Sequence, residues 1–68
     1  MEEDSRNDIR RLLKTFGVQA DDEIVRHLLH NQTSGPLHLR ITLDDLTDYG
    51  DHPPKELLHI VVEGDIRT

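Results

Sequence analysis

The sequence predicts one small α+β domain, residues 1–68, in which two N-terminal helices pack on a C-terminal antiparallel β-hairpin, in the order ααββ. Apolar residues recur at helical spacing in the N-terminal half, and they alternate with polar residues in two later runs. A length of 68 residues leaves room for one small core. Residues 1–4 are acidic at three positions and are expected to be disordered.

The first helix is expected over residues 6–16. Ser5 is suited to the N-cap position. Gly17 is expected to end the helix, because a glycine just past the last apolar residue is typical of a Schellman C-cap. The apolar stripe of this helix consists of Ile9, Leu12, Leu13 and Phe16.

The second helix is expected over residues 21–30, with acidic residues from Asp21 in its first turn. It should end near His30, because the following Asn-Gln-Thr-Ser-Gly-Pro segment is rich in turn residues. The connection between the helices is short, so they should form a helical hairpin or cross steeply. The apolar face of the second helix consists of Ile24, Val25, Leu28 and Leu29.

The two strands are expected over residues 37–45 and 57–67, joined by a loop with two prolines. Apolar residues occupy one face of both strands, and the other face fixes the register. Three complementary pairs form in one register: Arg40 with Glu63, Asp44 with His59, and His38 with Asp65. A slipped register that also aligns the apolar faces sets Arg40 against Val61. The inner face consists of Leu37, Leu39, Ile41, Leu43, Leu58, Ile60, Val62 and Ile66, with Gly64 in the same phase.

A two-stranded sheet has two open edges, and an unprotected edge is a template for another strand. We therefore expect a homodimer formed edge to edge through the hairpin, with the helices on one face of a four-stranded sheet. The alternative is a monomer in which charged side chains protect the edge.

The composition argues against several classes of function and of site. The net charge of −6 argues against nucleic acid, whose phosphates are bound by Lys and Arg. The absence of cysteine excludes disulfides and thiolate zinc sites, and the acidic N-terminus is unlike a signal peptide. No apolar run is long enough for a membrane span, so we expect a cytoplasmic protein.

The sequence contains few residues that could form a metal site or a catalytic site. His27 and His30 have a spacing that metal ligands use, but two ligands are not a site. The acidic loop over residues 44–52 lacks the alternation of a calcium loop. No nucleophile, base and orienting group can be assembled, so we expect neither enzyme activity nor a cofactor.

The remaining hypothesis is a protein–protein interaction or regulatory module that binds itself and an unidentified protein partner. An alternative is a metal- or small-molecule-binding protein whose His and Asp residues gather at a dimer cleft. The patterns are generic and indicate no particular family. The candidate interaction residues are Tyr49, Asp48, Asp51, His52, Arg10, Lys14, Leu57 and Val61.

Overall fold

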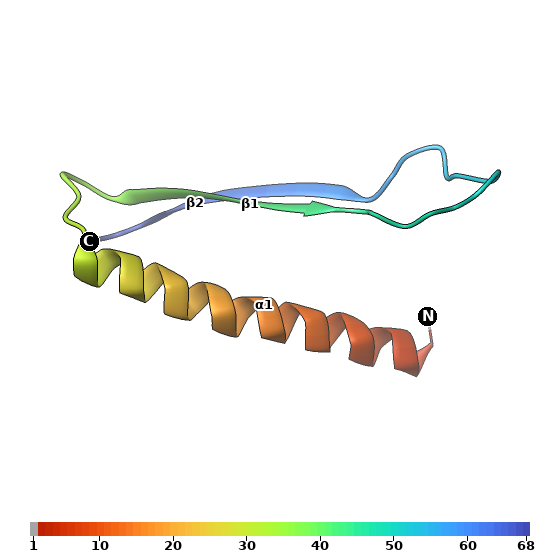
Figure 1. Cartoon of the computed structure of the whole chain (residues 1–68), viewed down its shortest axis with the longest axis horizontal. Coiled ribbons are helices and arrows are strands. Elements are labelled where there is room, and N and C mark those ends of the chain that lie inside the picture. Colours follow the sequence, from red (N-terminus) through yellow and green to blue (C-terminus); the bar gives the residue numbers. More distant parts are fainter. Residues whose placement is uncertain (1) are drawn as a thin grey trace. The chain divides into compact units, whose positions relative to one another are not determined.

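The structure is a computed structural model that describes residues 2–68. Figure 1 shows its three elements: helix α1 (Glu3–His30), strand β1 (Leu37–Asp44) and strand β2 (His59–Ile66). The α+β class and the antiparallel hairpin are confirmed. The chain divides into two compact units, one ending at Thr33 and the other beginning at Ser34, and each is described by itself.

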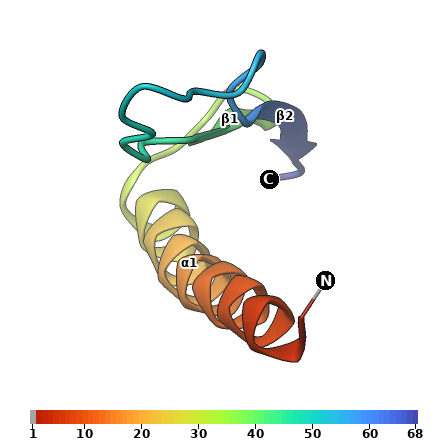
Figure 2. The ribbon, with the colours of Figure 1, turned by 90° about the vertical axis from the view of Figure 1, so that its right-hand side faces the viewer.

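The prediction of two helices, over residues 6–16 and 21–30, is wrong. One helix continues through Gly17, and its ribbon is unbroken in Figure 1 and Figure 2. A Schellman end at Gly17 requires a positive φ, but among residues 2–68 only Gly50 has one. Ending a helix leaves four carbonyl groups without partners, and starting another leaves four N–H groups. Continuing through a glycine costs only about 1 kcal/mol relative to alanine.

The helix begins earlier than expected. Glu2 occupies the N-cap position without a capping side-chain bond, and its carbonyl oxygen accepts from the Arg6 N–H at 3.2 Å. Glu3 and Asp4, which the sequence placed in a disordered end, lie in the first turn, where acidic groups favour the helix dipole. Ser5 therefore lies inside the helix and is not its N-cap.

Continuity places the apolar residues of both expected helices on one long helix. Steps of three and four residues connect them from Ile9 to Leu28, which gives a single stripe. A second apolar row, consisting of Val18, Val25 and Leu29, lies on a different side of the helix, and Leu29 is 78% exposed. No helix in residues 2–68 has the length and apolarity needed to span a membrane. The main stripe consists of Ile9, Leu13, Phe16, Ala20, Ile24 and Leu28.

The hairpin has the register expected from its charged face. Leu37 pairs with Ile66 at one end of the ladder, and Asp44 pairs with His59 at the other. The strands are slightly shorter than expected, although the Asp45 N–H still donates to the Leu58 carbonyl oxygen at 3.0 Å. The hairpin therefore has one charged face and one apolar face.

Candidate interaction surface

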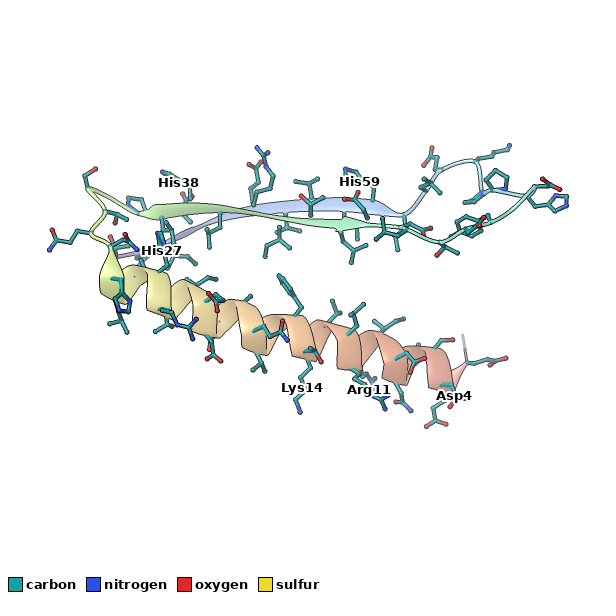
Figure 3. All side chains as sticks on the ribbon, in the orientation of Figure 1. Asp4, Arg11, Lys14, His27, His38 and His59 are labelled. Atoms are coloured by element: carbon teal, nitrogen blue, oxygen red, sulfur yellow. The ribbon has the colours of Figure 1, made fainter. Side chains whose placement is uncertain are left out.

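The outer face of the hairpin carries three cross-strand contacts between polar side chains, one Arg–Glu ion pair and two imidazole–carboxylate pairs. Nδ1 of His38 lies 2.6 Å from Oδ1 of Asp65, and Nδ1 of His59 lies 2.6 Å from Oδ1 of Asp44. Figure 3 shows His38 and His59 projecting from the same face of the hairpin. The third pair lies between them in the ladder, with Nη2 of Arg40 3.3 Å from Oε2 of Glu63.

These pairs specify the register more than they stabilise the fold. All six side chains are more than half exposed, and an exposed ion pair contributes about 0.2–1 kcal/mol at most. A shift of the ladder breaks all three at once, so they act together against a slipped register. A hollow at one end of the hairpin is lined by His38, Leu39, Arg40, Glu63, Gly64 and Asp65.

Hydrogen-bonded and non-hydrogen-bonded pairs alternate along the hairpin, and this alternation determines which backbone groups face the open edges of the sheet. The bond between Asp45 and Leu58 makes that pair a hydrogen-bonded one, and the pairs alternate along an antiparallel ladder. The pair of Thr42 with Val61 is therefore not hydrogen-bonded, and both residues direct their N–H and C=O groups outward. The same holds for all three charge pairs, whose close Cα spacing lets their side chains meet.

Within its own unit, the hairpin leaves its apolar inner face exposed. Ile41 is 46% exposed and Val62, its cross-strand partner, is 56% exposed. Leu58, just before β2, and Ile60, on the same inner face of β2, are 57% and 47% exposed.

The loop between the strands is organised around Asp45. Its carboxylate accepts from the Thr47 N–H at 2.9 Å, which is an Asx turn, and also from the Tyr49 hydroxyl. The Tyr49 hydrogen bond, followed by the bonds from Thr47, holds the pKa of Asp45 below its usual range. The same bond raises the pKa of Tyr49, because ionisation would remove the donor. Asp48 caps the next turn by accepting from the N–H of Gly50 at 2.9 Å.

Replacing Tyr49 with phenylalanine should raise the pKa of Asp45 toward its ordinary value. A lowered carboxyl pKa stabilises the folded loop at pH values above the unfolded pKa, and this stabilisation is lost as the pH falls through the folded pKa. The loop of the variant should therefore gain less order between acidic and neutral pH. NMR titration of the Asp45 carboxyl carbon measures the change. Asp48→Asn is the control and should leave the Asp45 titration unchanged, whereas an unshifted Asp45 in Tyr49→Phe would contradict this assignment.

The candidate interaction residues lie in three separate places. Asp48, Tyr49, Asp51 and His52 share the loop, and the hydroxyl of Tyr49 is engaged by Asp45. Leu57 precedes β2, and Val61 lies on its outer face opposite Thr42. Arg10 and Lys14 are exposed on α1, and Figure 3 shows Lys14 and Arg11 projecting from one side of it. Asp45, which organises the loop, was missed, although an Asp two residues before a Thr is a signal for an Asx turn.

The two helix histidines make local contacts near the end of α1. His30 Nδ1 lies 2.9 Å from the Arg26 carbonyl oxygen, and the Asn31 side-chain amide donates to the His27 carbonyl oxygen at 3.0 Å. Within the described part of the chain, no three His, Cys, Asp or Glu side chains are grouped as a metal site requires.

Comparison with known proteins assigns no family, since no protein-family model, curated protein or solved structure matches this chain. The surfaces that remain informative are the open edges of the hairpin, its exposed apolar face and its charged outer face.

Proposed function

We propose that this chain is a protein–protein interaction module that associates with a second copy of itself through an edge of its hairpin. The observation that carries the proposal is a regular two-stranded ladder, one face of which is apolar and whose outward N–H and C=O groups face the two edges of the sheet. An isolated hairpin is at best marginally stable in water, and further strands or a covering helix are needed.

Edge-to-edge pairing supplies the further strands. Two hairpins related by a twofold axis form a four-stranded sheet, and the same residues of each copy then contact one another. The new ladder satisfies one open edge of each copy and joins the two apolar faces into one larger face. The acidic net charge and the lack of cysteine support action on protein partners in the cytoplasm.

The alternative function is metal or small-molecule binding by histidines and aspartates that a dimer would bring together. The observation in its favour is the presence of two imidazole–carboxylate pairs, His38 with Asp65 and His59 with Asp44, on one face. Each pair alone offers too few ligands, so this function also depends on association.

Native mass spectrometry of the full chain tests both functions. We expect a species of twice the 7.9 kDa chain mass that gains no metal when zinc, nickel or calcium is added. A dimer that appears only with added metal would favour the alternative. A single-chain mass under all conditions would contradict both.

A further inference from the structure

We propose that the second copy pairs with β1 and not with β2, in an antiparallel ladder that places Ile41 opposite Ile41 of the second copy on the twofold axis. This inference rests on the proposed self-association and adds to it the edge, the register and the residues that meet.

Charge favours the β1 edge. β1 carries one basic and one acidic residue, Arg40 and Asp44, so two copies of it are neutral and complementary. β2 carries Glu63 and Asp65 and no Lys or Arg, so two copies of it bring four carboxylates into adjacent strands. Like charges placed across neighbouring strands destabilise a sheet. Gly64 further weakens β2 as a pairing edge, because glycine in a strand interior has no side chain to pack.

The outward groups of β1 set the possible registers. The outward N–H and C=O groups belong to every second residue of β1, four residues in all. Hydrogen bonds between the two copies can therefore form only in registers that pair these four residues with one another. A register centred on Arg40 sets two guanidinium groups against each other. It also places Pro36, which has no N–H, opposite Asp44. The outward residues are His38, Arg40, Thr42 and Asp44.

Among the registers that pair at least three of these four residues within the set, two remain, centred on Ile41 and on Thr42. The one centred on Thr42 pairs His38 with Leu46, which lies beyond the end of β1 and is 93% exposed. The one centred on Ile41 keeps every outward residue of Leu37–Asp44 paired within the strand. It therefore forms the longer ladder of hydrogen-bonded pairs.

The Ile41 register also matches side chains on both faces. On the inner face, Leu39 lies opposite Leu43 of the second copy, and the two Ile41 side chains meet on the axis. On the outer face, His38 lies opposite Asp44 of the second copy. Because His38 already pairs with Asp65 and Asp44 with His59, the contact completes an alternating row across four strands. Its members are Asp65, His38, then Asp44 and His59 of the second copy.

Single cysteines test the inference cleanly, because the chain contains no cysteine of its own. Ile41→Cys should form a disulfide-linked dimer under mild oxidation. The two Cα atoms at a non-hydrogen-bonded antiparallel pair lie about 4.5 Å apart, which a disulfide can bridge. Val62→Cys is the matched control, since Val62 faces Ile41 within the hairpin and lies on the same inner face. In the proposed dimer the two Val62 positions are three strand spacings apart, about 14 Å, which is beyond disulfide reach.

Thr42→Cys adds a test of the register, because position 42 meets its own copy only in the ladder centred there. Cross-linking that is fastest for Ile41→Cys and negligible for Val62→Cys supports the proposal. Faster cross-linking of Thr42→Cys overturns the register, and cross-linking of Val62→Cys alone overturns the choice of edge while self-association stands. If no variant cross-links although the untreated chain has the dimer mass, the pairing of β1 with β1 in either register is overturned. If the mass is that of one chain, the proposed function itself has failed.

Discussion

Replacing Thr42 with proline is expected to weaken the dimer about 30-fold, whereas replacing Val61 with proline should leave its affinity nearly unchanged. In the proposed ladder the Thr42 N–H donates to the Arg40 carbonyl oxygen of the second copy. By symmetry the substitution removes two such bonds, each worth about 1 kcal/mol. A loss of about 2 kcal/mol corresponds to about 30-fold in the dissociation constant.

The two substitutions make a matched pair. Thr42 and Val61 face each other in the hairpin, and neither N–H takes part in the bonds that join β1 to β2. Each proline therefore imposes a similar restriction of φ on the single chain and blocks one edge only. Sedimentation velocity of both variants gives the dissociation constants. Equal weakening by both prolines would mean that the hairpin itself had been damaged, and weakening by Val61→Pro alone would place the contact on β2.

Replacing Gly17 with alanine is expected to stabilise α1 by about 0.5–1 kcal/mol, because glycine inside a helix is less favourable than alanine. Within α1, a Cβ added at Gly17 meets no side chain other than its neighbours' within 4 Å, so no side-chain clash in the helix opposes the gain. Far-UV circular dichroism should show more helix and a higher melting temperature. If Gly17 instead ended a helix in the left-handed conformation, alanine would destabilise the helix. A loss of helix in Gly17→Ala would therefore support two helices over one.

Gly50 provides the contrasting control for this experiment. Its φ of 63° lies in the left-handed region, so Gly50→Ala should destabilise the loop by about 1–2 kcal/mol. Asn tolerates this region better than Ala, so Gly50→Asn should recover part of the loss. The two glycines should thus respond to alanine with opposite signs.

The hairpin could be predicted in detail because two independent patterns agree on it. Apolar alternation identifies the strands, and the Arg40–Glu63 pair with its two neighbours identifies the register. The helix could not be predicted as well, because a glycine followed by Asp21 and Asp22 is compatible with both a break and a continuous helix. The choice depends on whether new helix ends would find partners for their backbone groups, which residue pattern alone does not reveal.

The contacts within the loop likewise could not be predicted from the sequence. The sequence indicated Tyr49 only as a candidate interaction residue. The structure shows its hydroxyl bound to Asp45, so it also holds the loop together. Several carboxylates lie within reach in sequence, and only the loop geometry selects one of them. The register of the second copy along β1 likewise requires knowing which pairs of the ladder are hydrogen-bonded, and the bond between Asp45 and Leu58 fixes this.

Sedimentation equilibrium of the unmodified chain tests the central claim most directly. The measurement covers about a hundredfold range of concentration, because association obeys mass action. We predict that the average mass rises with concentration from that of one chain toward twice 7.9 kDa and does not exceed it, as a closed twofold dimer requires. A mass that stays at one chain throughout, or that grows without limit, would contradict a closed dimer formed through one edge of the hairpin.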